Sequence, residues 1–241
     1  MMKQLPQRME MVLSLCGRAP FAVDVGCDHA YLSIALVDRG IADEAMATDI
    51  FAGPLWHAKA NIEKEGYSDR ISVHQGDGLG SENLRKKLAE RNGGILLIAG
   101  MGGILMRRIL MEALPYLPHF SQLVLQPQSD ADRVRTFLAE YGFTIDREDA
   151  MHDRAGHYYE AVHAVPGKMS LRDAEALYGP YLIRTGNSAL AGHIERQRKI
   201  NASIRENLLV RRVRDTSRLI GLDIEEELMK EALRMMPGKT E

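Results

Sequence analysis

Acidic side chains that follow apolar runs are the residues of this chain best placed to do chemistry. Asp28 lies in the loop after the first run, Asp49 ends the second, and Asp77 follows the third. Asp49 comes 23 residues after Gly26, a spacing at which a carboxylate accepts hydrogen bonds from both hydroxyls of a ribose. Asp77 could accept a hydrogen bond from the exocyclic amine of adenine. We therefore expect a nucleotide-type cofactor here, although each aspartate taken alone also fits an N-cap or a turn.

Two glycine-containing turns accompany these acids. Gly26 lets the backbone turn sharply and approach a ligand, and Ala30 is small enough for the next helix to pack closely. The second turn, at residues 100–103, follows another apolar run and is similar to a dinucleotide-binding loop. However, Leu105 stands where the third glycine of that motif belongs, and the next run ends in Gln126 instead of an acid. The match to that motif is therefore incomplete.

Strand and helix patterns alternate along the part of the chain that contains these residues. Apolar runs predict strands at 21–25, 44–50, 71–74, 95–99 and 123–125. Helical periodicity predicts helices within the first twenty residues and at 31–39, 54–64 and 131–141. This alternation indicates an α/β fold with a doubly wound parallel sheet, which binds ligands at the carboxyl edge of its strands.

The rhythm changes after the fifth strand. Residues 143–148 and 158–165 read as two successive strands, with a turn at 153–156. A terminal hairpin added to five parallel strands favours methyltransferases over dehydrogenases, and S-adenosylmethionine is the cofactor that such a class requires. No strand pattern follows residue 170, where two or three helices are expected. We place the domain boundary at Pro166-Gly167, which gives a cofactor-binding domain at 1–166 and a helical domain at 167–241.

Composition excludes several classes of protein. The chain has 241 residues and a formal net charge of -2, which does not suit a globally basic nucleic-acid binder. Its longest apolar run, at 95–106, is interrupted by glycines and is too short to span a bilayer. The first residues lack the features of a secretory signal, so we expect a cytoplasmic protein without a membrane partner. Both cysteines, Cys16 and Cys27, are expected to be free thiols.

The chain shows no pattern of a metal site. Apart from His29, its histidines are expected to have neither a carboxylate partner at i, i+4 nor a cysteine cluster beside them. Neither a Gly-x-Ser-x-Gly elbow nor a phosphate-binding Gly-Lys-Ser/Thr loop occurs, which excludes the commonest hydrolase and P-loop classes.

One stretch of the helical region is strongly basic. Between Arg184 and Arg218 the acidic residues are Glu195, Glu206 and Asp215, whereas nine residues are basic: Arg184, Arg196, Arg198, Lys199, Arg205, Arg211, Arg212, Arg214 and Arg218. Such an excess of positive charge suits a polyanion. The alternative is a solvated helix face that binds nothing.

Several short strings of the chain together resemble one family. They are the segments 24–32 (DVGCDHAYL), 53–54 (GP), 98–103 (IAGMGG), 125–127 (LQP), 158–160 (YYE) and 178–182 (YGPYL). In these strings the chain is similar to the bacterial tRNA adenine-22 N1-methyltransferases, the TrmK family. The resemblance extends over nearly the whole chain. Cys27, Asp49 and Gln128 depart from the usual pattern, in which Glu is common at the second position and Asn at the third.

The resemblance implies a Rossmann-like methyltransferase domain, a C-terminal coiled-coil-like helical domain, S-adenosylmethionine as cofactor and tRNA as substrate. It implies a cofactor site made of the following residues: Gly26, Cys27, Asp28, His29, Tyr31, Asp49, Ile50, Asp77, Gly78, Ala99, Gly100, Met101 and Gly102. Residues 100–102 would replace the Asn-Pro-Pro-Tyr motif of many amino-group methyltransferases.

Asp28 and His29 are the candidate catalytic residues. Adenine N1 has a lone pair that can attack a sulfonium methyl group, so little acid-base assistance is required. Asp28 could stabilise the cationic product or accept the N6 proton, or it could instead cap the following helix. His29 either takes part in the chemistry or packs at the start of that helix.

Two rival functions remain at this point. One is methyl transfer to a protein or small molecule, which leaves the basic stretch without a purpose. The other is a regulator that binds S-adenosylmethionine without catalysis. The sequence leaves the oligomeric state open.

Overall fold

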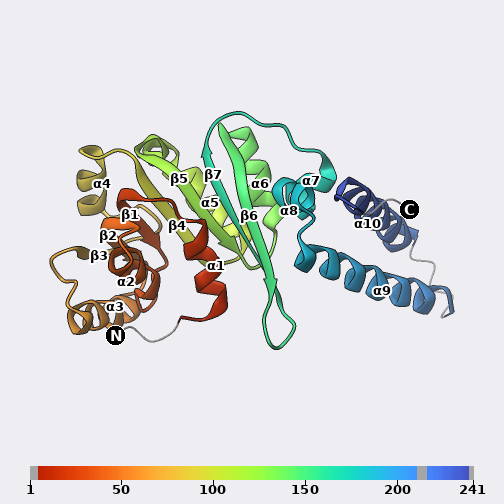
Figure 1. Cartoon of the computed structure of the whole chain (residues 1–241), viewed down its shortest axis with the longest axis horizontal. Helices are drawn as coiled ribbons and strands as arrows, with labels where there is room; N and C mark the ends of the chain where they lie inside the picture. Colours follow the sequence, from red (N-terminus) through yellow and green to blue (C-terminus); the bar gives the residue numbers. More distant parts are fainter. Residues whose placement is uncertain (1–4, 211–215, 239–241) are drawn as a thin grey trace.

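A seven-stranded sheet forms the centre of the molecule (Figure 1). The computed structural model describes residues 5–210 and 216–238. The strand order is β3-β2-β1-β4-β5-β7-β6. The strands are β1 (Ala19–Val25), β2 (Ala42–Asp49), β3 (Ile71–Gln75), β4 (Gly94–Met101), β5 (Phe120–Pro127), β6 (Phe143–His152) and β7 (Tyr158–Pro166). The first five are parallel, as the sequence predicted, so their carboxyl ends share one edge of the sheet.

Helices cover both faces of this sheet. One layer holds α1 (Gln7–Leu15), α2 (Tyr31–Asp38) and α3 (Ala52–Glu65). The other holds α4 (Glu82–Ala89), α5 (Gly103–Ala113) and α6 (Ala131–Glu140), with a 3-10 helix, η1 (Leu114–His119), before β5. In β1, Phe21 and Val23 pack toward the second layer and Ala22 toward the first. The central strands are therefore buried on both faces, which explains their continuous apolar runs.

The hairpin predicted after the parallel strands is present. β7 pairs antiparallel with β5, and β6 pairs antiparallel with β7 at the edge of the sheet. The turn between them lies at residues 153–157, where the Asp153 N–H donates to the carbonyl of His157. The fold is thus a Rossmann-like sheet with the antiparallel extension that distinguishes methyltransferases.

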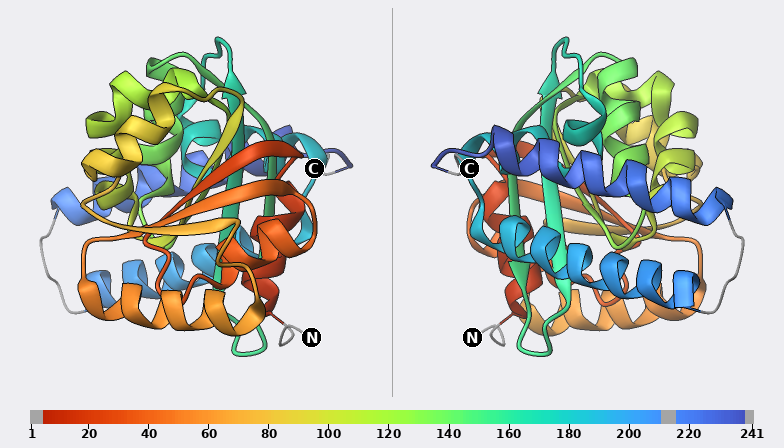
Figure 2. Two further views of the ribbon diagram at one scale, coloured as in Figure 1. Left: turned by 90° about the vertical axis from the view of Figure 1, so that its left-hand side faces the viewer. Right: turned by 90° about the vertical axis from the view of Figure 1, so that its right-hand side faces the viewer.

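Four helices are described after the sheet, where two or three were expected. They are α7 (Asp173–Tyr178), α8 (Pro180–Thr185), α9 (Ser188–Val210) and α10 (Thr216–Met235). The expected number was wrong because Gly179, with φ of +89°, separates two short helices that the pattern merges. α9 and α10 run side by side and extend away from the sheet (Figures 1 and 2).

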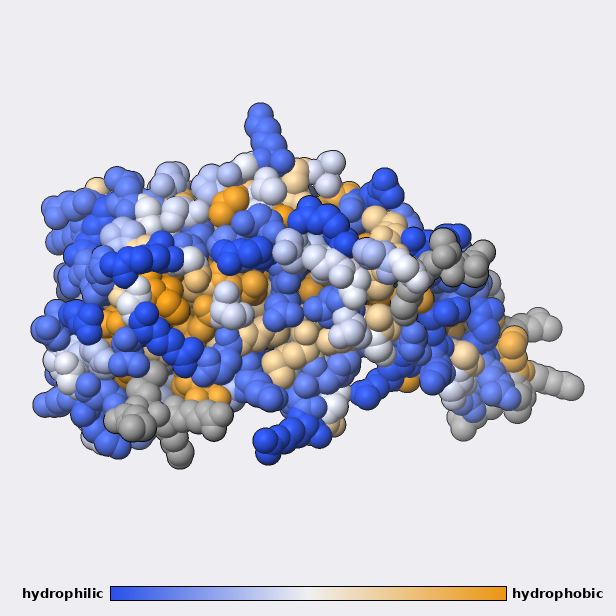
Figure 3. All heavy atoms as spheres, in the orientation of Figure 1, coloured by the Kyte–Doolittle hydropathy of each residue, from blue (hydrophilic) through white to orange (hydrophobic). Residues whose placement is uncertain are grey.

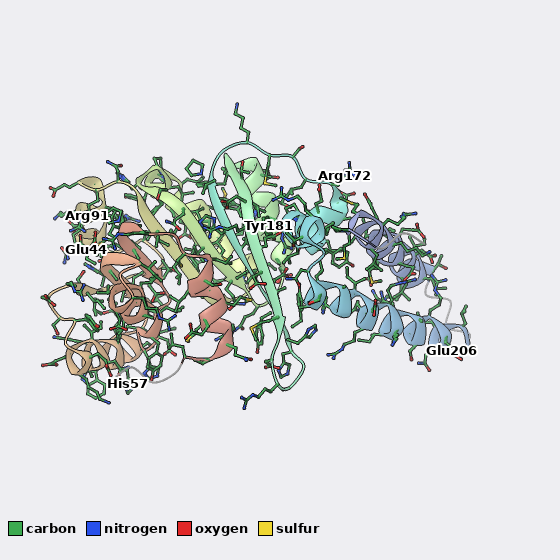
Figure 4. All side chains as sticks on the ribbon, viewed as in Figure 1. Glu44, His57, Arg91, Arg172, Tyr181 and Glu206 are labelled. Atoms are coloured by element: carbon green, nitrogen blue, oxygen red, sulfur yellow. The ribbon has the colours of Figure 1, made fainter. Side chains whose placement is uncertain are left out.

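A buried ionic cluster joins the sheet to these helices. Arg135 of α6 donates to Glu148 of β6 and to Glu160 of β7, and the Arg135 and Glu148 side chains are fully buried. Arg135 also donates to the carbonyls of Ala176 and Leu177 in α7. Glu148 in turn accepts from backbone N–H groups at the start of α8, including that of Tyr181, which is labelled in Figure 4.

Apolar packing reinforces this junction. Ala150 of β6 shares a core with residues from all four C-terminal helices, among them Tyr178, Leu182, Ile194 and Met229. In Figure 3, hydrophobic side chains reach the surface over the sheet, whereas the far end of α9 and α10 is mainly hydrophilic. None of the helices described here has both the length and the apolar character needed to cross a membrane.

Candidate functional site

Two adjoining cavities lie at the carboxyl ends of the parallel strands. The larger has a volume of about 420 Å³ and the smaller about 180 Å³. The structure brings together in their walls twelve of the thirteen residues predicted for the site. The larger is lined by Gly26, Asp28, Asp49, Ile50, Asp77, Gly78, Ala99, Gly100 and Met101. The smaller is lined by Gly26, Cys27, Asp28, His29, Tyr31, Ala99 and Gly100. Gly102 lines neither and instead precedes α5 as its N-cap.

The loop after β1 forms the wall between these cavities. The N–H groups of Gly26 and Cys27 both donate to the carbonyl of Thr48, which holds the loop against β2. Gly26, Asp28 and Ala30 all have positive φ. An aspartate and an alanine in the left-handed region are strained, and such strain is concentrated at functional sites.

Asp28 does not cap the following helix. The N-cap of α2 is Ala30, and no side chain makes a capping hydrogen bond there. The Asp28 side chain is 73% exposed, and the residue lines both cavities. His29 lies beside it, with 3.8 Å between His29 Nε2 and Asp28 Oδ1. The helix-cap interpretation of Asp28 is therefore wrong, and its carboxylate is free to face a ligand.

Asp49 has a structural role as well as a place in the larger cavity. Its Oδ1 accepts a hydrogen bond of 3.0 Å from the backbone N–H of Phe51, which is an Asx turn. Its Oδ2 has no hydrogen-bond partner among the described residues. A carboxylate with one oxygen tied to the turn and the other free can still receive the hydroxyl groups of a ligand.

Asp77 forms an ion pair with another residue of the chain, Arg108. Arg108 of α5 donates to both of its carboxylate oxygens, at 2.9 and 3.1 Å, and also to Glu112. These hydrogen bonds with Asp77 raise the pKa of Arg108 above its usual value. Both Asp77 and Arg108 line the larger cavity. A ligand amine at Asp77 must therefore share the carboxylate with a guanidinium group.

The predicted site left out several residues that line the smaller cavity, among them the polar residues Arg8, Asp24 and Gln126. Asp24 is buried, and Ser33 Oγ donates to its Oδ2 at 2.6 Å. Burial raises the pKa of Asp24 to about 6, from an ordinary value of 3.8. The sequence did contain a signal for Asp24, because an acid two residues before Gly26 lies at the carboxyl end of β1, where ligands bind.

Gln126, which lines the smaller cavity, has a buried and unsatisfied side-chain oxygen. The residue is fully buried at the end of β5, and its Nε2 donates to the carbonyl of Pro127 at 3.0 Å. Its Oε1 has no partner among the described residues. A buried carbonyl oxygen without a donor is costly, so this atom suits an N–H group of a ligand.

The turn after β4 is closed against the end of β5. The Gly103 N–H donates to the carbonyl of Ser129, and the Gln128 N–H donates to the carbonyl of Met101, both at 2.8 Å. A Cβ at Gly103 would lie 2.1 Å from the carbonyl oxygen of Asp130, so only glycine fits. These contacts hold the turn after β4 next to Gln128, which lines the smaller cavity.

The basic stretch is less positive than its sequence suggests. Arg198, Arg205 and Arg218 form ion pairs with Glu226, Asp223 and Glu225 of α10. Arg211, Arg212 and Arg214 lie outside the described residues. Across residues 167–241 there are 14 Lys and Arg against 11 Asp and Glu, because an acidic run follows the basic one.

The expectation that no other histidine has a carboxylate partner at i, i+4 was wrong. His157 Nδ1 lies 3.0 Å from Asp153 Oδ2, where the hairpin turn brings the two together. In the described part of the chain, no group of three His, Cys, Asp or Glu is arranged to hold a metal ion. Cys16 and Cys27 are both free thiols, as expected.

The parallel sheet, its antiparallel hairpin and a cleft at the ends of β1, β2 and β4 define a Rossmann-like methyltransferase. The chain belongs to the TrmK family, tRNA (adenine(22)-N(1))-methyltransferase, whose model matches residues 22–230.

Individual relatives agree with this family over most of the chain. The tRNA (adenine(22)-N(1))-methyltransferase of Bacillus subtilis is 32% identical over 191 residues, which is 77% of each chain. The crystal structure of B. subtilis TrmK has a TM-score of 0.81 at 30% identity and covers 95% of this chain and 98% of that chain. A Streptococcus pneumoniae protein crystallised with S-adenosyl-L-methionine has a TM-score of 0.80 at 30% identity, covering 95% and 100%.

Proposed function

We propose that this protein transfers the methyl group of S-adenosylmethionine to N1 of adenine 22 in tRNA. One observation supports this most directly. A member of the TrmK family has two adjoining cavities at the carboxyl edge of its sheet, and one acidic residue, Asp28, lines both. Such a cleft accommodates the two halves of an elongated cofactor in its two cavities, with Asp28 between them.

The residues of the larger cavity fit the adenosine part of this cofactor. Asp49 offers a free carboxylate oxygen to ribose hydroxyls, and Asp77 offers its remaining lone pairs to the adenine amine. Ile50, Met101 and Ile109 supply apolar surface for a flat ring.

The smaller cavity fits the amino-acid end. Asp24 and the unsatisfied Gln126 Oε1 are acceptors that suit an ammonium group. Gly26, Ala99 and Gly100 line both cavities and would lie close to the cofactor. When bound, S-adenosylmethionine supplies an electrophilic methyl group on a positively charged sulfur.

The protein residues then have a limited chemical task. Adenine N1 already carries the attacking lone pair, so the enzyme mainly holds the base in line with the methyl group. We assign to Asp28 the stabilisation of the positive charge that develops on adenine, or acceptance of the N6 proton. His29, with its Nε2 at 3.8 Å from Asp28 Oδ1, is the second candidate catalytic residue.

The helical part is assigned to the RNA. We divide the chain into a cofactor-binding domain at 1–166 and a helical domain at 167–241, and we assign tRNA binding to the basic surface of α9. Arg196 and Lys199 of α9 favour this, together with Arg184 of the preceding helix α8, since none of the three has a carboxylate partner within the described residues. The reaction belongs in the cytoplasm, where its tRNA substrate is found.

A tritiated-methyl assay tests the proposal. Protein, labelled cofactor and a tRNA transcript with adenine at position 22 should yield 1-methyladenosine at that position after nuclease digestion. A transcript with guanine at position 22 serves as the matched control and should accept no label there. Label on another nucleotide, on protein or on nothing at all would refute the assignment.

A further inference from the structure

Four aromatic rings form a continuous strip beside the smaller cavity. The rings of His29 and Tyr31 are stacked with centroids 5.5 Å apart. His57 follows at 5.1 Å from His29, and Trp56 meets His57 edge-on at 5.0 Å. We name these four residues the aromatic strip. His29 and Tyr31 line the smaller cavity, so the strip begins in the cleft and continues onto α3, where Figure 4 labels His57.

The aromatic strip is held in place yet open to solvent. Asn61 of α3 donates from Nδ2 to the carbonyl of His29 at 3.0 Å, which holds the loop that contains His29 against the helix that contains Trp56 and His57. Trp56 is 69% exposed and Tyr31 is 41% exposed. A Cβ added at the neighbouring Gly53 would meet no atom of the described residues within 4 Å, so the surface is open at that position. Adjoining exposed rings of this size mark a binding surface.

We propose that the aromatic strip stacks the unpaired bases that flank the target adenine in the RNA substrate, a role that rests on the proposed tRNA methylation. The pairing edge of adenine must be exposed for N1 to react, and extraction of that base leaves its neighbours without stacking partners. Aromatic rings bind such bases regardless of sequence. The exposed carboxylate of Asp28 lies at the inner end of the strip and repels phosphate, so bases rather than the RNA backbone face the rings.

The fluorescence of Trp56 reports directly on this contact, because it is the only tryptophan in the chain. Titration of the full-length protein with a tRNA transcript should quench or shift that fluorescence. Raising the salt concentration should move the titration midpoint to higher tRNA concentration, because phosphate contacts weaken. The change at saturation should persist, because stacking releases no counterions.

Substitutions separate stacking from folding. Trp56→Ala should raise the KM for tRNA by about 5- to 150-fold, the range for the loss of one stacked base. Trp56→Phe retains a ring and should recover most of the loss, and the cofactor Kd should not change in either variant. Tyr141→Ala is the matched control, since it removes a 38% exposed ring at the end of α6, away from the cleft.

Each outcome has one meaning. If the enzyme methylates tRNA, either of two results would refute base stacking by the aromatic strip and leave the proposed function intact. One is a wild-type KM in Trp56→Ala, and the other is constant Trp56 fluorescence at saturating tRNA. Quenching by tRNA without methylation supports the strip and refutes the proposed function. A Trp56 shift that depends on protein concentration without RNA overturns the strip in favour of contact with a second copy of the chain.

Discussion

At the scale of single residues, the cleft combines acids in different states. Asp28 is exposed, Asp49 is tied to a turn by one oxygen, Asp77 is paired with Arg108, and Asp24 is buried with a raised pKa. These environments suit different tasks, because a solvated or half-free carboxylate accepts hydrogen bonds readily, whereas a buried one stabilises a cation.

The pKa of Asp24 predicts how stability depends on pH. Because its pKa is about 6 in the folded protein against an ordinary 3.8, the folded state binds the proton more tightly. This contribution to stability is complete below about pH 4 and is lost as the pH rises through 6, a loss of about 3 kcal/mol. Asp24→Asn should therefore make the cofactor-free protein more stable than wild type at pH 8, with a smaller difference at pH 4.5.

Urea unfolding of both proteins at the two pH values checks this. Equal stability of Asp24→Asn and wild type at pH 8 would show that burial of the charged Asp24 carboxylate does not destabilise the folded protein. The same variant should bind cofactor less tightly, because an amide cannot balance the charge of an ammonium group.

Asp49 allows its structural and ligand-binding roles to be separated. Asp49→Ala should weaken cofactor binding by about 1.5 to 3 kcal/mol, the range for hydrogen bonds to a charged group. Asp49→Asn keeps an oxygen for the Phe51 N–H and should preserve thermal stability while still weakening binding. Isothermal calorimetry measures both, and a wild-type cofactor Kd in Asp49→Ala would remove this residue from the site.

At the scale of secondary-structure elements, the link between α6, the hairpin and the short helices α7 and α8 is ionic. Arg135 and Glu148 are buried together, and each also binds backbone groups across the junction. Burial raises the pKa of Glu148, and the Arg135 guanidinium opposes that rise. The sheet and the helical part therefore depend on each other for the satisfaction of buried polar groups.

Removal of one member of this cluster should be severe. Arg135→Met leaves the buried Glu148 carboxylate and the nearby Glu160 without their cation, and we expect a loss of about 3 to 5 kcal/mol in unfolding free energy. The double variant Arg135→Met/Glu148→Gln removes the buried charge as well and should regain part of that loss. Denaturant unfolding compares the two, and a loss below about 1 kcal/mol in the single variant would contradict a structural role.

At the scale of the whole molecule, charge on the helical extension is partly neutralised. The arginines of α9 that face α10 form ion pairs there, whereas Arg184, Arg196 and Lys199 have no carboxylate partner within the described residues. Arg184 instead lies over the Tyr181 ring at 4.9 Å, and Arg196 donates to the carbonyl of Gly156. Cations without a carboxylate partner can bind RNA phosphates, and release the counterions of those phosphates, without breaking an ion pair inside the protein.

The salt dependence of tRNA binding distinguishes the two kinds. Replacement of Arg184, Arg196 and Lys199 by Ala should flatten the slope of log K against log salt by about 2, at somewhat under one unit per phosphate contact. Arg205→Ala, which removes the partner of Asp223, is the control and should change the slope little. Filter binding across a series of salt concentrations gives the slopes. Equal slopes for wild type and the triple variant would make this basic surface a solvated helix face.

The sequence by itself determined the order of the seven strands along the chain and the carboxyl-edge turns that follow the parallel ones, although several strand ends differ by a few residues, as in β5 (Phe120–Pro127). Burial of parallel strands on both faces produces apolar runs, and the turns that follow them require glycines and acids, so both features are local and readable. The five parallel strands, the hairpin and the residues at the carboxyl edge, such as Asp49 and Gly100, were predicted in this way. The helices after residue 170 were miscounted because a single glycine, Gly179, separates two short helices.

Only the tertiary structure decided what those residues contact. Arg108 reaches Asp77 across 31 residues of chain, Glu148 receives the Tyr181 N–H across 33, and Gln126 is left with an unsatisfied oxygen. Helix and strand periodicity carries no information on such distances, because it records which face of one element is buried and not which side chain of another element lies opposite. The pairing of Asp77 and the burial of Asp24 arise where α5 and α2 pack against the sheet, and packing is a property of the assembled chain.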